Sequence, residues 1–199
     1  MNTTAPSRVS VVKKEEKEAK LTEFIRAALT ARVFDADSAP VDCCLVVARS
    51  PESPIIRALA TLASDLMSAG IPVKTIFAGP EVADGLASVL PQGFEARVLK
   101  GSGFLEGHEQ LVLGPTTVWI GDCMRREPGK RDAFEFYAND CSQSSSWARI
   151  SFMRLWPMGR TVPLASAPVP LVETAEPSLA PGAIPPAPED AKPTVSTRH

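Results

Sequence analysis

The chain has 199 residues, enough for one domain of ordinary size with a hydrophobic core and flanking segments. Its formal net charge is -2, so no overall positive field attracts nucleic acid, and we expect no nucleic-acid partner. The sequence has no run of the roughly 18–20 apolar residues that a membrane span requires, and its N-terminus lacks the apolar stretch of a signal peptide. We therefore predict a cytoplasmic protein without a membrane span.

The first part of the chain predicts a flexible end, a charged helix and a buried strand. Residues 1–10 are polar and are expected to be flexible. Over 11–34, apolar residues at helical spacing accompany a mixed run of lysines and glutamates, which predicts a charged amphipathic helix with a solvated face. Residues 41–48 are almost entirely apolar, as expected for a strand buried on both faces of a sheet.

Strands and helices are expected to alternate up to residue 99. Helices are predicted between 54 and 70 and over 80–90, and strands over 71–78 and 94–99; this order implies parallel pairing through crossovers. Strands at 108–113 and 117–121 are joined only by Gly114-Pro115-Thr116, so they must form an antiparallel hairpin. The predicted fold class is α/β: a mixed sheet with parallel βαβ units, a terminal antiparallel hairpin and helices on both faces.

The C-terminal part divides into an end of the domain and a tail. A helix is predicted over 128–139, followed by a polar spacer at 142–146 and a short last helix from Trp147 to Leu155. The α/β domain is expected to span residues 40–156. From residue 157 the composition becomes rich in proline and alanine, which predicts a disordered tail over 157–199.

The motif that bears most on function is the hairpin that His108 begins. His108-Glu109-Gln110 opens its first strand, and Gly121-Asp122-Cys123 ends its second. A histidine on one strand that faces small and polar residues at the end of the other is a layout used for phosphodiester chemistry. Together with the order of strands and helices before it, this stretch resembles one half of a phospholipase D-like domain over roughly residues 50–140.

The resemblance implies a nucleophilic role for His108, with Gln110 at the position of the family's lysine and Asp122 at that of its serine. Pro115 stands at the family's aspartate, and Glu135 at an acidic residue often carried in the next helix. A phosphodiester transition state needs positive charge and hydrogen-bond donors, whereas Gln110 is neutral and Asp122 is negative. The catalytic candidates are therefore His108, Gln110 and Asp122 in a degenerate site, and a single copy needs a homodimer to supply the second histidine.

Each of these residues also has a purely structural interpretation. His108 has the alternative of a histidine satisfied by a backbone group, and Asp122 that of a turn or helix N-cap aspartate. A basic patch follows the hairpin: Arg125, Arg126, Lys130 and Arg131. It predicts binding of a phosphate or carboxylate. The alternative is a solvated loop whose charges pair with Glu127, Asp132 and Glu135.

The four cysteines show no Cys-x-x-Cys pair and no regular framework, so reduced thiols are expected. A metal site would have to combine Cys43 or Cys44 with His108, Asp122 and Cys123, and this spacing matches no zinc motif. We expect neither a metal nor another cofactor.

Three functions remain open from the sequence. The first is a non-catalytic phospholipase D-like domain that acts as a binding or regulatory module for a protein or a small anionic ligand. The second is an active phosphodiesterase or phosphatidyltransferase that uses His108 in a homodimer. The third is a Rossmann-like small-molecule binder with its site near Ser50 and Glu81, at the ends of the first two strands.

Overall fold

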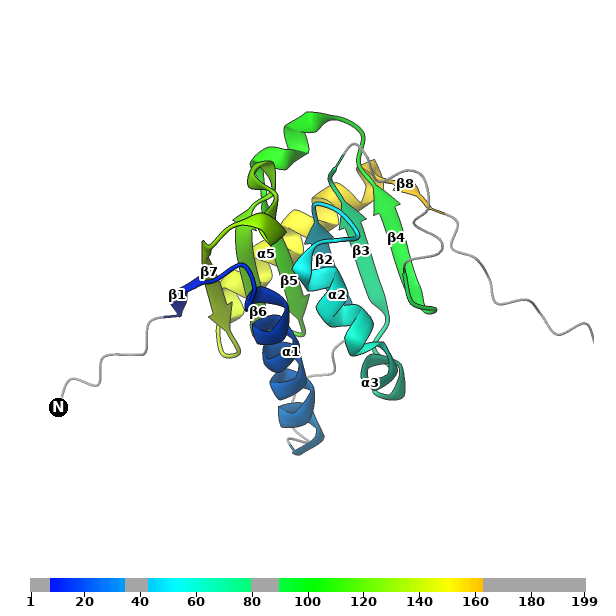
Figure 1. Cartoon of the computed structure of the whole chain (residues 1–199). Coiled ribbons are helices and arrows are strands. Elements are labelled where there is room, and N and C mark those ends of the chain that lie inside the picture. The colour runs from blue at the N-terminus through cyan, green and yellow to red at the C-terminus, as the bar shows by residue number, and fades with distance from the viewer. Residues whose placement is uncertain (1–7, 35–42, 80–89, 163–199) are drawn as a thin grey trace, which may run out of the picture. The chain divides into compact units, whose positions relative to one another are not determined.

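An eight-stranded mixed sheet forms the framework of the residues that the structure, a computed structural model, describes: 8–34, 43–79 and 90–162. The strand order is β1-β7-β6-β5-β2-β3-β4-β8 (Figure 1). The strands are β1 Val9–Val12, β2 Cys44–Ala48, β3 Val73–Phe77, β4 Phe94–Val98, β5 His108–Leu113, β6 Thr117–Cys123, β7 Ala133–Ala138 and β8 Arg160–Thr161. Strands β2, β3 and β4 are parallel, and every other neighbouring pair is antiparallel. The predicted α/β class with a mixed sheet is confirmed.

Helices cover both faces of this sheet (Figure 1). Helix α1 (Lys17–Phe34), α2 (Pro54–Thr61) and α3 (Ala63–Ser68) pack on one face, which we call the α1 face. Helix α5 (Ser142–Leu155) packs on the other, the α5 face. Strand β2 supplies Val46 to the core on the α1 face and Leu45 and Val47 to the core on the α5 face. Both sides of β2 are therefore buried, as its continuous apolar sequence predicts.

The N-terminal helix is shorter than predicted, because a strand occupies the beginning of the expected range 11–34. Residues Val9–Val12 pair with β7 as strand β1, and α1 begins only at Lys17. Val9 and Val11 are exposed while Val12 is buried, so the segment follows the two-residue period of a strand. The prediction of a flexible segment over 1–10 was therefore wrong for Val9 and Ser10.

The helix predicted over 128–139 was wrong. A short 3-10 turn (Pro128–Lys130) is followed by strand β7. In this strand Ala133 and Glu135 are buried on one face, and Phe134 between them is exposed on the other. Residues 133–136 of β7 pair with β1 and residues 136–138 pair with β6, so both edges of the strand contribute to its backbone hydrogen bonding. The polar spacer predicted at 142–146 was also wrong, because Ser142 already begins α5.

The end of the described chain continues past the predicted domain limit at residue 156. A 3-10 turn covers Trp156–Met158, and Arg160–Thr161 pair with β4 as strand β8. The remaining predicted tail, 163–199, and the helix predicted over 80–90 lie outside the described residues, apart from Leu90. Within the described ranges, no helix has the length and apolar character needed to cross a membrane.

Candidate functional site

The start of β5 and the end of β6 lie at the edge of the sheet where β2 has its carboxyl end, because β5 runs antiparallel to β2. This edge is a frequent location of binding sites in α/β folds. His108 is the register partner of Cys123, and Gln110 is the partner of Ile120. One residue of β5 therefore faces two residues of β6, Gly121 and Asp122, which form a β-bulge beside the histidine.

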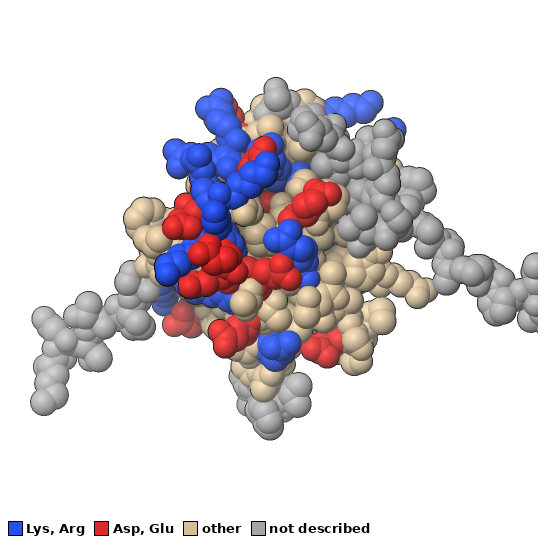
Figure 2. Space-filling view, in the orientation of Figure 1, with Lys and Arg blue, Asp and Glu red and all other residues tan. Residues whose placement is uncertain are grey.

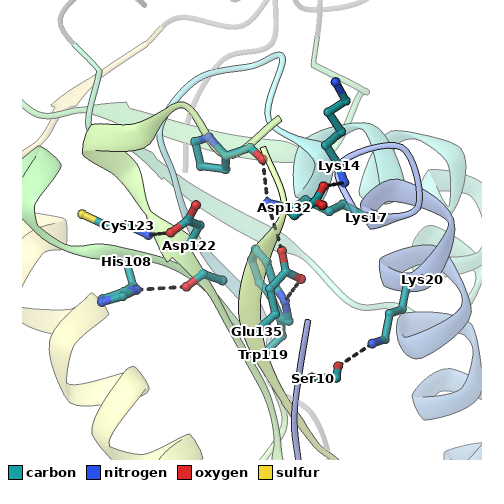
Figure 3. Close-up of polar contacts among 12 residues, drawn as sticks. Ser10, Lys14, Lys17, Lys20, His108, Trp119, Asp122, Cys123, Asp132 and Glu135 are labelled. Atoms are coloured by element: carbon teal, nitrogen blue, oxygen red, sulfur yellow. Dashed lines mark hydrogen bonds and ion pairs between the residues drawn. The ribbon is translucent and has the colours of Figure 1, made fainter. Parts of the chain in front are cut away.

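His108 is exposed, and its ring is fixed by a backbone group. Its Nδ1 lies 2.9 Å from the carbonyl oxygen of Gly121, and a carbonyl only accepts, so Nδ1 carries the hydrogen (Figure 3). Gly121 itself packs under Trp119: a Cβ at this position would lie 2.3 Å from the indole ring. The glycine predicted by the motif thus has a packing role, since no other residue allows this approach of Trp119.

The other two catalytic candidates are bonded elsewhere. The amide Nε2 of Gln110 donates to the carbonyl oxygen of Ala148, 3.1 Å away in α5. Asp122 is buried; its Oδ1 accepts from the Cys123 N–H at 2.7 Å, as in the turn interpretation (Figure 3), and its Oδ2 has no hydrogen-bond partner among the described residues. Pro115 lies in the turn at the opposite end of the hairpin. Gln110 and Asp122 are therefore held by other groups, and neither makes a hydrogen bond to His108 in the described part of the chain.

A buried polar cluster lies on the α1 face, away from His108 (Figure 3). The Glu135 carboxylate accepts from Trp119 Nε1 at 3.0 Å and from the Tyr137 hydroxyl at 2.7 Å. The ammonium of Lys17 lies 3.4 Å from Glu135 Oε1 and donates to the Pro128 carbonyl oxygen at 2.7 Å. Burial, and next the bond to Glu135, raise the pKa of the Tyr137 hydroxyl. Glu135 was expected in a helix, and its place in β7 is what brings it to Trp119.

Glu109 is the second buried carboxyl on the α1 face, and it was not among the residues predicted for the site. Its Oε1 accepts from the Arg49 N–H at 2.9 Å. Burial raises the pKa of Glu109 to about 7, although bonds from Arg49 and Ser53 and the charge of Lys17 act in the opposite direction. The available signal was its register: Glu109 alternates with Leu111 and Leu113, which are core residues on the same face.

The predicted basic patch lies on the loop of residues 124–131, which we call the basic loop. Figure 2 shows lysine and arginine side chains gathered in the upper left of the view, with acidic side chains beside them. Arg125 pairs with Glu106, and Lys130 pairs with Glu127. Lys130 lowers the pKa of the Glu127 carboxyl, first through its hydrogen bond and then through its charge.

The remaining cations of the basic loop, Arg126 and Arg131, are exposed and have no ion-pair partner in the described part of the chain. Of the partners that the alternative interpretation named, Glu127 does pair within the loop. Asp132 instead accepts from the Lys14 N–H at 2.9 Å (Figure 3), and Glu135 is buried in the cluster described above. Ion pairs therefore neutralise two of the four predicted cations of the basic loop.

The guanidinium of Arg49 joins this loop to β2. It donates to the Met124 carbonyl oxygen and lies 3.7 Å from Glu127 Oε1. Lys17 holds the same loop from α1 through Pro128. Two cations thus fix the backbone of the basic loop, one on each side, and Arg126 and Arg131 project from a loop with a defined position.

The remaining candidates contribute no further site among the described residues. The four cysteines are free thiols, and no group of three or more histidine, cysteine or acidic side chains is placed to hold a metal. Ser50, named for a small-molecule site, donates its backbone N–H to Ser53 Oγ at 3.2 Å. Glu81 lies outside the described residues.

Comparison with known proteins finds solved structures of similar fold. No family model matches the chain, and no curated protein matches it. NucT from Helicobacter pylori is similar, with a TM-score of 0.50 and 12% sequence identity, over 77% of this chain and 98% of NucT. Nuc from Salmonella typhimurium, described as a phospholipase D family member, has a TM-score of 0.47 and 16% identity over 77% of this chain and 97% of Nuc.

A third similar structure is TrmBL2, described as an archaeal chromatin protein, with a TM-score of 0.45 and 16% identity. The match covers 81% of this chain and 57% of TrmBL2, so this chain spans little more than half of that protein. The similarity to NucT shows that this chain has a similar fold, and an identity this low shows the fold alone.

Proposed function

We propose that this chain is a phospholipase D-like domain that does not hydrolyse phosphodiesters and that binds an anionic ligand through its basic loop. The observation that carries the proposal is that the candidate side chains of the hairpin are each held by other groups. His108 is held by Gly121, Gln110 is bonded to α5, and Asp122, itself part of the bulge, is buried and bonded to Cys123.

The missing positive charge supports the first half of the proposal. Phosphoryl transfer requires donors and cations that are already aimed at the phosphate oxygens. Gln110 brings no charge, and its amide is already donated to Ala148. Asp122 would repel an anionic phosphate placed next to His108. An exposed imidazole without these partners is a poor phosphodiester nucleophile.

The exposed arginines of the basic loop support the second half. Arg126 and Arg131 project from a loop whose backbone is fixed by Arg49 and Lys17. Guanidinium groups recognise phosphate and carboxylate oxygens through paired hydrogen bonds. A cation pair with a defined backbone loses less conformational freedom on binding than one on a flexible segment.

Turnover is the test of the first half. The purified full chain and His108→Ala are compared with bis(p-nitrophenyl) phosphate and with a panel of phospholipids and nucleotides. We expect no release of product above the buffer rate for either protein, with circular dichroism confirming that both are folded. Product release that depends on His108 would establish the alternative, an active phosphodiesterase or phosphatidyltransferase.

Binding is the test of the second half, with inorganic pyrophosphate as the probe in titration calorimetry. We expect the double substitution Arg126→Gln and Arg131→Gln to weaken binding by about a hundredfold or more, because each lost charged hydrogen bond contributes roughly 1.5–3 kcal/mol and about 1.4 kcal/mol corresponds to tenfold. Arg160→Gln removes a charge from exposed β8 at the opposite edge of the sheet and serves as the matched control. Equal weakening by the control would mean that only net charge matters and would contradict a site on the basic loop.

A further inference from the structure

A buried carboxyl lies among the groups that hold the basic loop in place. Glu109 is 1% exposed and accepts from the Arg49 N–H at 2.9 Å. The same Arg49 binds the loop through its guanidinium, which donates to the Met124 carbonyl oxygen and lies 3.7 Å from Glu127 Oε1. One residue therefore connects the buried carboxyl directly to the loop.

The start of α2 is a second contact that Glu109 and the loop share. Ser53, which precedes α2, is bonded to the Glu109 carboxyl. The next residue, Pro54, packs against the loop, since a Cβ on Gly129 would lie 3.8 Å from the Pro54 Cδ. Any adjustment of Ser53 to the carboxyl therefore reaches the loop through its neighbour in the chain.

Lys17 is the third contact, and its charge acts on two carboxyls. Its ammonium lies 3.4 Å from Glu135 Oε1 and donates to the Pro128 carbonyl oxygen at 2.7 Å (Figure 3). The charge of Lys17 also acts on Glu109, and the charge of Glu135 acts on Glu109 in the opposite sense. When Glu109 is neutral, Lys17 has one buried anion to attract it, and when Glu109 is ionised it has two.

We propose that Glu109 is a proton switch for the basic loop: its neutral form leaves the loop firmly held, and its ionised form loosens it. An ionised Glu109 competes with the Pro128 carbonyl oxygen for the Lys17 ammonium, because a carboxylate attracts a cation more strongly than a neutral carbonyl does. Ionisation also gives the cluster of Lys17, Glu135 and Glu109 a net negative charge next to the loop.

The surroundings of Glu109 place this switch near neutral pH. The charged groups that face it are Lys17 from α1, Arg49 after β2, Glu135 from β7 and, across the bulge of β6, Asp122. Burial is the largest influence and raises the pKa of Glu109 from 4.5 to about 7. An acid with a raised pKa ionises only as the pH passes that value, so the loop is firmly held at pH 5 and loosened at pH 8.

Loosening of the loop affects anion binding, and this consequence rests on the proposed function. Arg126 and Arg131 bind an anion best when the backbone that carries them is fixed. The net negative charge of the ionised cluster also opposes an anion at the loop. Affinity for an anion should therefore fall as the pH rises from 5 to 8, whereas loosening itself requires no ligand.

Amide hydrogen exchange resolved by NMR tests the switch in the full chain without a ligand. The Met124 N–H is bonded to the Gly107 carbonyl oxygen at 2.9 Å. Within the loop, the Lys130 N–H is bonded to the Glu127 carbonyl oxygen at 2.9 Å. We expect the protection factors of these two amides to fall at least about fivefold from pH 5 to pH 8, the lower end of usual coupling between two sites. Glu109→Gln should keep them at the pH 5 level throughout.

Two control variants separate this result from other causes. Glu95→Gln removes a 60% exposed carboxyl on β4 and should keep the wild-type response. Imidazole is the side chain that ordinarily changes charge between pH 5 and 8, so His108→Ala should also keep the response if Glu109 is the switch. Loop amides with equal protection at both pH values, or a response that survives in Glu109→Gln, would overturn the proposal. Protection that falls in β2 and not in the loop would also count against it, because ionisation would then destabilise only the fold as a whole.

A titration of the same proteins with inorganic sulfate, which keeps its double charge over this pH range, measures the consequence for binding. We expect sulfate to bind the wild type at least about fivefold more weakly at pH 8 than at pH 5, and Glu109→Gln to reduce this difference. Sulfate binding that is equally tight at both pH values would contradict the switch. The expected exchange result in a protein that binds no sulfate at either pH would support the switch and contradict the proposed function.

Discussion

Substitution of Lys17 by methionine is expected to lower the free energy of unfolding by about 3–5 kcal/mol, because it leaves the buried Glu135 carboxylate without its cation. The Trp119 and Tyr137 donors remain, but neither carries charge. The loop loses its bond at Pro128 as well. Urea unfolding followed by tryptophan fluorescence measures the change.

Two further proteins make this result interpretable. Lys13→Met removes an exposed lysine whose partner is Glu16, and it should change the free energy of unfolding by less than about 1 kcal/mol. The double variant Lys17→Met with Glu135→Gln removes both buried charges, and it should regain part of the loss. A Lys17→Met protein as stable as Lys13→Met would show that the buried pair contributes nothing.

Glu109→Gln is expected to increase stability, and by more at pH 8 than at pH 5. The pKa of this carboxyl rises from an ordinary value of 4.5 to about 7 in the folded protein, mainly because the group is buried. The folded state therefore holds the proton more tightly than the unfolded state, and ionisation of Glu109 destabilises the fold progressively from about pH 4.5 to pH 7. At 1.36 kcal/mol per pKa unit, the upper limit of the gain above pH 7 is about 3 kcal/mol.

Glutamine suits this position because its carbonyl oxygen can still accept from the Arg49 N–H. Free energies of unfolding at several pH values between 5 and 8 would measure the effect. Glu95→Gln, at a 60% exposed side chain on β4, is the control and should show no such growth with pH. Parallel stability curves for wild type and Glu109→Gln would mean that Glu109 does not titrate in this range.

The sequence was sufficient for elements whose pattern is local. The continuous apolar run of β2 and the three-residue link at Gly114-Pro115-Thr116 each allow one structure, and both were predicted correctly. β7 was missed because its aromatic residues, Phe134, Phe136 and Tyr137, fit a helical as well as a strand period over so short a length. Its pairing with β1 is more than a hundred residues distant in sequence, by the register Val9 to Phe136.

The candidate site shows the same limit. The motif located the hairpin correctly. However, the hydrogen bond of Gln110 depends on α5, and the ion pair of Glu135 depends on β7 and α1. The bulge at Gly121 and Asp122 is a matter of register that composition does not reveal. The residue types and their spacing therefore predicted the location of the candidate site. The tertiary contacts determine which of its side chains are available to a ligand.

The pairing of β1 with β7 also constrains the order in which the chain can fold. Strand β1 leaves the ribosome before the other strands of the sheet, yet its register partners are residues 133–136, which are made more than a hundred residues later. Until then, Val9, Val11 and Val12 have no strand to join, and α1 has no Glu135 for Lys17. Long-range pairing of this kind slows folding and leaves apolar segments exposed during synthesis. This edge of the sheet is therefore completed late, although its outer strand is made early.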